Sequence, residues 1–259
     1  MGRISKIGLQ LFSVRGSLDT PEKAAETFRK LKALGYDEGQ TAGCYGMPYD
    51  LFYSLAQDAG IEIIGTHDDF NLMKTDIEKS IANHKMLHTA HMGIGGFGAQ
   101  DVAAVEEFIE AANKIARRIA EEGMKFTYHN HSQEFIRLEN GRTAMEMLME
   151  GLDPQHTSFV LDTYWVQNAG GDVCAWIEKL AGRIDILHLK DMACHRNEEG
   201  RCVGYITEIG HGNMDFHRII DAALKAGVKH FCVEQDNCPA DFEPSLAFSS
   251  RYLHENFMK

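Results

Sequence analysis

Short apolar runs alternate with longer amphipathic segments along the whole chain. The apolar runs have the length of buried strands, and an amphipathic segment such as the first begins at Thr20-Pro21 and ends at Leu34-Gly35, which are typical helix boundaries. We expect strands at residues 6–12, 37–42, 62–67, 89–93, 125–131, 158–165, 184–190 and 230–235. We expect helices at residues 21–34, 48–59, 73–87, 101–122, 144–149, 173–180, 216–226 and from about 244 onward. Strands that alternate with helices predict a parallel sheet covered by helices.

Eight strand–helix units fill 259 residues at roughly 32 residues each, and this number and length of units are typical of a (β/α)8 TIM barrel. We therefore predict an α/β protein with a single barrel domain over residues 1–259. The alternative, a doubly wound open sheet, requires a glycine-rich phosphate turn after the first strand, and residues 10–16 do not form one. Residues 192–213 are the longest segment without a pattern, and we expect them to be an active-site loop.

Composition excludes several classes of function. Lys and Arg number 26 against 38 Asp and Glu, so the net charge of −12 argues against nucleic-acid binding. No run of 18 apolar residues predicts a membrane span, and the first residues do not resemble a signal peptide. Six scattered cysteines then indicate reduced thiols and a cytoplasmic location, with Cys194-His195 and Cys202 as a weak metal-like cluster.

Polar side chains occur where the predicted strands end. In a parallel barrel both faces of a strand are buried, and the carboxyl ends of the strands carry the active site. Burying so many polar groups at one rim without a function is costly. The residues in question are Gln10, Gln40, His67, His91, His129, His131, Asp162, His188, Lys190 and Glu234.

Four of these strand ends offer metal ligands. A histidine from residues 128–131, Asp162, His188 and Glu234 would converge on one point if the barrel closes. Two imidazoles argue against Mg²⁺ and two carboxylates argue against a soft metal, so Mn²⁺, Co²⁺, Zn²⁺ or Fe²⁺ fits best. His129 and His131 alternate by two along a strand, so both can face the site and either could hold the metal.

Several motifs in this order resemble the sugar phosphate isomerase/epimerase family, which belongs to the xylose isomerase-like TIM barrel superfamily. They are residues 8–15 (GLQLFSVR), 128–135 (YHNHSQEF), 161–165 (LDTYW), 188–191 (HLKD) and 233–236 (VEQD). The resemblance implies a metal-dependent enzyme, with Mn²⁺ expected first and Mg²⁺ also open. It implies a small sugar, keto-sugar or inositol-like polyol as substrate, and it leaves a homo-oligomer open.

The resemblance also implies roles for individual residues. Asp162, His188 and Glu234 match the superfamily's metal ligands, whereas His129 stands where the superfamily has a glutamate. Candidates for proton transfer are Glu234, His131 and Glu134, with Lys190 as a donor to a developing oxyanion or a leaving hydroxyl. Glu134 could instead orient a histidine. Lys190 could instead form an ion pair with Asp191 or Glu134. Candidates for substrate binding are Gln10, Arg15, His67, His91 and Trp165.

Two reactions follow from these roles. The first is isomerisation or epimerisation through an enediolate, which forms when a base removes the proton next to a carbonyl. The second is elimination of water by a lyase that acts on a keto-sugar or an inosose. His129 keeps the second reaction open, because the superfamily's ketose epimerases exchange the proton between two metal-bound glutamates. An abasic-site endonuclease and a non-catalytic sugar-binding barrel are rival functions, which the charge and the full set of ligands argue against.

Overall fold

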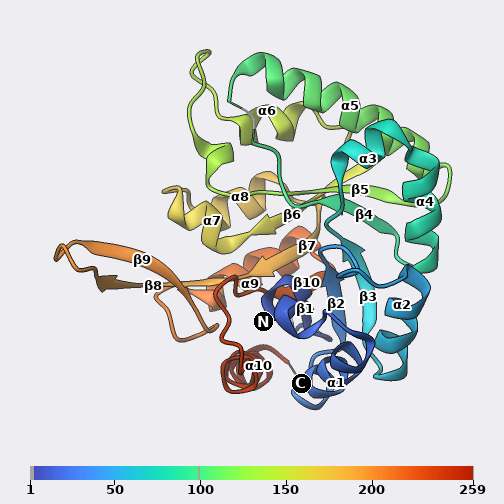
Figure 1. Ribbon diagram of the computed structural model, residues 1–259. Helices are drawn as coiled ribbons and strands as arrows, with labels where there is room; N and C mark the ends of the chain where they lie inside the picture. Colours follow the sequence, from blue (N-terminus) through green and yellow to red (C-terminus); the bar gives the residue numbers. More distant parts are fainter. Residues whose placement is uncertain (1–2, 99, 259) are drawn as a thin grey trace.

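The computed structural model describes residues 3–98 and 100–258. In this part of the chain, eight parallel strands form a nearly closed barrel surrounded by helices (Figure 1). The strand order is β3-β2-β1-β10-β7-β6-β5-β4, which confirms the predicted TIM barrel. The strands are β1 (Gly8–Gln10), β2 (Glu38–Thr41), β3 (Glu62–Thr66), β4 (His91–Ile94), β5 (Lys125–His129), β6 (Thr157–Asp162), β7 (Ile184–Leu189) and β10 (His230–Val233).

The helices lie outside the barrel and cover its strands (Figure 1). Their ends follow the expected signals: the Thr20 hydroxyl accepts from the main chain of Lys23 at the first helix, and Gly227 ends a later one with φ of 83°. The helices are α1 (Pro21–Ala33), α2 (Tyr49–Asp58), α3 (Phe70–Thr75), α4 (Ile77–Met86), α5 (Val102–Ala120), α6 (Ala144–Gly151), α7 (Thr163–Asn168), α8 (Val173–Lys179), α9 (Phe216–Ala226) and α10 (Glu243–Phe257), with short 3-10 turns η1 (Leu11–Ser17) and η2 (Gln133–Phe135).

Two elements differ from the sequence-based expectation because an aspartate caps a helix inside the predicted segment. The helix expected at 73–87 is divided into α3 and α4 at Asp76, whose side chain accepts from the main chain of Lys79. The strand expected to reach residue 165 ends at Asp162, whose side chain accepts from the main chain of Trp165 and starts α7. In both cases side-chain capping competes with the regular pattern.

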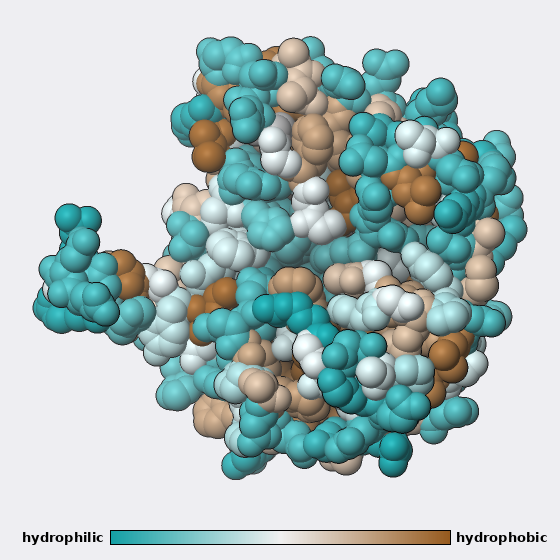
Figure 2. Space-filling model, in the orientation of Figure 1, coloured by the Kyte–Doolittle hydropathy of each residue, from teal (hydrophilic) through white to brown (hydrophobic). Residues whose placement is uncertain are grey.

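The expectation that residues 192–213 form an irregular loop is wrong. Strands β8 (Asp191–Arg196) and β9 (Cys202–Thr207) pair antiparallel and form an arm that projects from the barrel (Figure 1). Figure 2 shows the tip of this arm as mostly hydrophilic. His195 points to the opposite face of the ribbon from Cys194 and Cys202, because side chains alternate along a strand. The weak metal-like cluster predicted there is therefore not formed.

The barrel has a seam between β3 and β4. Across the described residues, one main-chain hydrogen bond bridges these strands, from the Asp68 amide to the Gly93 carbonyl at 2.8 Å. A Cβ at position 93 would lie 2.8 Å from the carbonyl oxygen of Thr66 and 2.9 Å from that of Thr127, so only glycine permits this approach. Inside the barrel, Ile64 and three side chains from other strands form a small apolar cluster. None of the helices over the described residues has the length and hydropathy that a bilayer-spanning segment needs.

Candidate active site

The four residues with metal-ligand chemistry meet at the carboxyl end of the barrel. His129 and Asp162 are the last residues of β5 and β6, His188 is the penultimate residue of β7, and Glu234 follows β10 directly. All four are buried, and one ligand atom from each lies within 4.8 Å of the others. Of the two histidines that end the fifth strand, the structure brings His129, and not His131, into this group.

Neighbouring groups hold the two histidines in orientations that leave one ring nitrogen free. The Nε2 of His188 lies 2.5 Å from the Oε1 of Gln40, which can only accept, so Nε2 donates and Nδ1 carries the lone pair. The Nδ1 of His129 lies 3.3 Å from the carbonyl of Gly95, which leaves the lone pair on Nε2. Such outer partners commonly orient metal-ligating histidines.

The carboxylates direct one oxygen toward the same point. One oxygen of Asp162 caps α7, while Oδ2 lies 3.5 Å from Nε2 of His129 and 3.8 Å from Nδ1 of His188. The Oε2 of Glu234 lies 2.9 Å from Nδ1 of His188 and 4.0 Å from Nε2 of His129. These four atoms are buried, and none has a hydrogen-bond partner among the described residues.

This donor set fits a divalent cation. A tetrahedral ion with bonds of about 2.1 Å separates its ligand atoms by about 3.4 Å. The four histidine–carboxylate separations are 2.9–4.0 Å, and all the ligand atoms lie within 4.8 Å of one another. Buried polar atoms without a partner are rare in proteins and indicate a missing ligand. Two nitrogens and two carboxylate oxygens suit Mn²⁺, Zn²⁺, Co²⁺ or Fe²⁺. A metal ion can therefore be held by this group.

Lys190 lies against both carboxylates. Its Nζ is 3.0 Å from Oδ2 of Asp162, 2.8 Å from Oε2 of Glu234 and 3.2 Å from Oδ2 of Asp236. The expected alternatives, ion pairs with Asp191 or Glu134, are wrong. The carboxylate of Asp191 instead accepts main-chain hydrogen bonds at the base of the arm, including those from Gly210 and Gly212.

The electrostatics of this cluster keep its charged groups charged. Burial would raise the pKa of Asp162 and of Glu234, but the Lys190 ammonium and the neighbouring His129 and His188 together outweigh burial and hold both pKa values below their ordinary values. Burial would lower the pKa of Lys190, but Asp162 and Glu234 raise it above its ordinary value. The cluster therefore contains carboxylates and an ammonium at neutral pH.

Further ring nitrogens and an indole line the same space. The rings of His67 and His129 lie 4.9 Å apart, and those of His131 and Trp165 lie 5.3 Å apart. The Nε2 of His67, the Nδ1 of His131 and the Nε1 of Trp165 are buried without hydrogen-bond partners. Burial, followed by the neighbouring His129, lowers the pKa of His131 to about 4, so its ring is neutral at pH 7.

The other predicted residues have different surroundings. Gln10 contacts Gln40 at 3.2 Å and His67 at 3.3 Å, beneath the space described above. Arg15 is exposed at the rim, where its guanidinium lies 4.0 Å from the ring centroid of Phe12 and donates to the carbonyl of Asp236. Both residues remain close to the carboxyl end of the barrel.

One predicted role does not agree with the structure. His91 was expected at the end of the fourth strand, but it is the first residue of β4 and lies at the opposite end of the barrel, where it contacts Asp185 at 3.6 Å. Glu134, in contrast, lies in the turn after β5, where it accepts from the Tyr128 hydroxyl with one oxygen and from the His131 amide with the other. Burial raises the pKa of Glu134 above its ordinary value.

Sequence reasoning gave no role to two residues that the structure places in the cluster. Gln40 is the penultimate residue of β2 and orients His188. Asp236 lies in the turn after β10, next to Lys190. A carboxylate directly after the predicted strand end was the available signal for Asp236.

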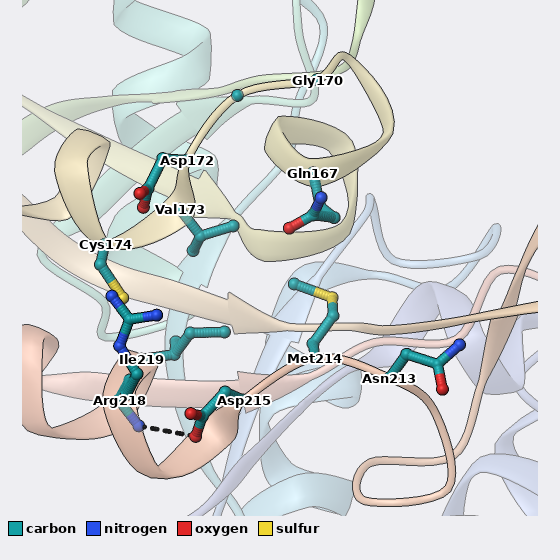
Figure 3. A pocket seen from close by; sticks show the side chains of 11 residues that line it. Gln167, Gly170, Asp172, Val173, Cys174, Asn213, Met214, Asp215, Arg218 and Ile219 are labelled. Atoms are coloured by element: carbon teal, nitrogen blue, oxygen red, sulfur yellow. Dashed lines mark hydrogen bonds between the residues drawn. The ribbon is translucent and has the colours of Figure 1, made fainter.

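A separate cavity of about 360 Å³ lies outside this cluster. Figure 3 shows it between the end of α7 with the loop that follows, where Gln167 and Asp172 lie, and the start of α9, with Asp215 and Arg218. The Arg218 amide donates to Asp215 at 3.1 Å, which is an ordinary helix cap. None of the residues predicted for the active site lines this cavity.

Three comparisons place the chain among known proteins. The inosose dehydratase of Geobacillus thermodenitrificans is 30% identical over 175 residues, which is 61% of this chain and 58% of that protein, so the match spans little more than half of the relative. The structure of a sugar phosphate isomerase/epimerase from Parabacteroides distasonis superimposes with a TM-score of 0.79 at 23% identity, over 100% of this chain and 96% of that chain. An L-ribulose 3-epimerase superimposes with a TM-score of 0.74 at 14% identity, over 97% and 94% of the two chains. The two structures share the fold, and since the family described as xylose isomerase-like TIM barrel matches residues 5–252, the chain belongs to that family.

Proposed function

We propose that this protein is a metal-dependent enzyme that removes the proton next to the carbonyl of an inosose or keto-sugar and then eliminates water. The observation that carries the proposal is the convergence of four buried ligand atoms, from His129, Asp162, His188 and Glu234, within 4.8 Å of one another. A divalent cation, Mn²⁺ in our proposal, would polarise the substrate carbonyl as a Lewis acid.

We assign removal of the proton to His131. Of the predicted proton acceptors, Glu234 belongs to the metal-ligand group, and Glu134 is held in the turn after β5 by the Tyr128 hydroxyl and the His131 amide. His131 keeps a buried ring nitrogen without a partner, and its ring lies 4.8 Å from that of His129. A base must reach its proton before its pKa matters, and what supports His131 is its place beside His129, next to the group that would hold the metal.

Lys190 and the unpartnered ring groups supply the remaining contacts. The Lys190 ammonium donates a proton to the departing hydroxyl. Lys190 directly follows β7, and its ammonium contacts Glu234 and Asp236, which follow β10. His67 and Trp165 offer free N–H groups or ring nitrogens to substrate hydroxyls. An elimination needs a base at one carbon and a donor at the next, which is what a histidine and a lysine provide.

Epimerisation is the second candidate reaction. An L-ribulose 3-epimerase shares the fold, but its identity of 14% carries less weight than the 30% of the inosose dehydratase. His129 stands where the superfamily has a glutamate, and the resemblance implies that two-base epimerisation uses both glutamates. We therefore place dehydration first.

A reaction in deuterium oxide separates the two candidates. We would load the protein with Mn²⁺, add an inosose or a ketohexose, and follow the products by NMR and mass spectrometry. Dehydration predicts a product that has lost one water, whereas epimerisation predicts an unchanged skeleton with one deuterium at the inverted carbon. If a panel of inososes and keto-sugars gives neither product while Mn²⁺ is bound, the proposal is wrong.

His131→Ala tests the assigned base. We expect a fall in kcat of about 10²–10⁴-fold with Mn²⁺ affinity retained. His195→Ala is the matched control, since His195 is exposed on the arm and contacts Tyr205. Equal activity in both variants would remove His131 from the reaction.

A further inference from the structure

Lys190 is buried in the cluster that can hold the metal. Its Nζ lies within 3.0 Å of the same two carboxylate atoms, Oδ2 of Asp162 and Oε2 of Glu234, that the metal would use. Both oxygens are buried, so each contact is a short ion pair in which the ammonium balances the charge of a carboxylate.

A cation bound to these oxygens would lie close to the ammonium. With bonds of about 2.1 Å, the ion is no more than about 5 Å from Nζ, since Nζ is 2.8 Å from Oε2 of Glu234. Two positive charges at this separation repel strongly in a buried site. The metal and Lys190 therefore compete for the same pair of carboxylates.

Asp236 offers Lys190 a second position. Its two oxygens lie 3.2 and 3.4 Å from Nζ, and these contacts do have hydrogen-bond geometry. Asp236 is 31% exposed, whereas Asp162 and Glu234 are buried, so it lies on the solvent side of the cluster. Asp236 is therefore the carboxylate that Lys190 could keep if a metal took the other two.

The rest of Lys190 is fixed. The Thr163 hydroxyl donates to the Lys190 carbonyl at 2.9 Å and accepts from the Lys190 amide at 3.0 Å. The ring centroid of Trp165 lies 5.2 Å from Nζ, which provides a cation–π contact on one side. Movement is therefore confined to the side chain between Asp236 and the two buried carboxylates.

We propose that Lys190 is a built-in counter-cation, which neutralises Asp162 and Glu234 when no metal is bound and shifts onto Asp236 when a divalent cation enters. Lys190 and Asp236 are then positioning residues that set the metal affinity. This inference rests on the proposed metal site. It goes beyond the proposed reaction, because it assigns Lys190 a role before any substrate is present.

Metal binding to the whole protein tests the role of Lys190. We would measure the Mn²⁺ dissociation constant by calorimetry for the wild type and for Lys190→Met, which keeps most of the side-chain volume and removes the charge. We expect Mn²⁺ to bind at least tenfold more tightly to Lys190→Met, and we expect the metal-free variant to have a lower Tm because Asp162 and Glu234 repel each other. If Lys190 only orients the carboxylates, the variant will bind Mn²⁺ more weakly, which overturns the inference.

Lys125→Met is a matched control for the change of charge. The Nζ of Lys125 lies 2.9 Å from the buried carboxylate of Asp185, at the amino end of the same barrel. We expect this variant to keep the wild-type affinity for Mn²⁺ within about twofold, because the lost charge is far from the metal site. An equal gain in affinity in Lys125→Met would mean that net charge, and not the position of Lys190, is responsible.

A double-mutant cycle tests whether Asp236 acts through Lys190. Asp236→Asn should weaken Mn²⁺ binding several-fold in the wild type. The weakening should be much smaller in the Lys190→Met background, because that variant has no ammonium for Asp236 to bind. Equal weakening in both backgrounds would show that Asp236 acts only by its own charge, and it would refute the claim that Lys190 shifts onto Asp236. If wild-type protein binds no Mn²⁺, the proposed function fails; if it binds Mn²⁺ and Lys190→Met binds no more tightly, only this inference fails.

Discussion

Replacing Asp185 by asparagine should destabilise the protein without changing its chemistry. Asp185 is buried near the amino end of β7, with Nζ of Lys229 at 2.7 Å and Nζ of Lys125 at 2.9 Å. A hydrogen bond to a charged group contributes about 1.5–3 kcal/mol, and the exposed lysines regain water in the variant, so we expect a loss of about 2 kcal/mol at pH 7. Asp185 precedes His188 by three residues, about 10 Å along the strand, so kcat should be unchanged.

The loss should depend on pH in one direction. Burial would raise the pKa of Asp185, but His91 and the two lysines outweigh burial and hold the pKa well below its ordinary value. The carboxylate therefore contributes stability that is present above the unfolded pKa of about 3.9 and is lost as pH falls through the folded pKa. We would compare urea unfolding of wild type and Asp185→Asn at pH 7 and as far below pH 4 as the protein remains folded. Equal midpoints at pH 7, or a difference that does not shrink in acid, would refute this reasoning.

Three further predictions concern the metal site. Glu234→Gln should weaken Mn²⁺ binding by at least about 100-fold and abolish turnover. If calorimetry finds that the variant binds Mn²⁺ with wild-type affinity, Glu234 is not a ligand. Gln40→Ala should weaken Mn²⁺ binding by about 10–100-fold, because His188 loses the acceptor at 2.5 Å that fixes its ring; Gln57→Ala on α2 is a control that should bind normally. Mn²⁺ at 100 times its dissociation constant should stabilise the fold by about 2.7 kcal/mol in thermal unfolding, and a chelator should reverse this; an unchanged Tm would mean that the folded state does not bind the ion.

The fold was predictable because each strand–helix unit repeats one local pattern. Residues 216–226 match α9 at both ends, since the cap at Asp215 and the left-handed Gly227 are local signals. The arm at residues 191–207 was not predictable, because a two-stranded ribbon in solvent has no buried face to impose alternation.

The candidate site was predictable where a residue ends a strand, as at Asp162 and His188, because the barrel itself brings strand ends together. His91 was misplaced because the fourth strand begins later than expected, so the same residue lies at the other end of the barrel. The place of Lys190 against Asp162 and Glu234 required three-dimensional contacts that no spacing in the sequence encodes.

The seam between β3 and β4 has a consequence for motion. Elsewhere neighbouring strands are joined by regular parallel pairing, whereas here a single described main-chain bond joins Asp68 to Gly93. Two side-chain hydrogen bonds also cross the seam, from His91 to the carbonyl of Ile64 and from the Gly93 amide to the Thr66 hydroxyl. With so little main-chain pairing, we expect local opening at the seam to cost less free energy than opening between regularly paired strands. We expect the main-chain amides along β3 and β4 to exchange with solvent first. His67 directly follows β3, so it lies beside the part of the barrel that opens most readily.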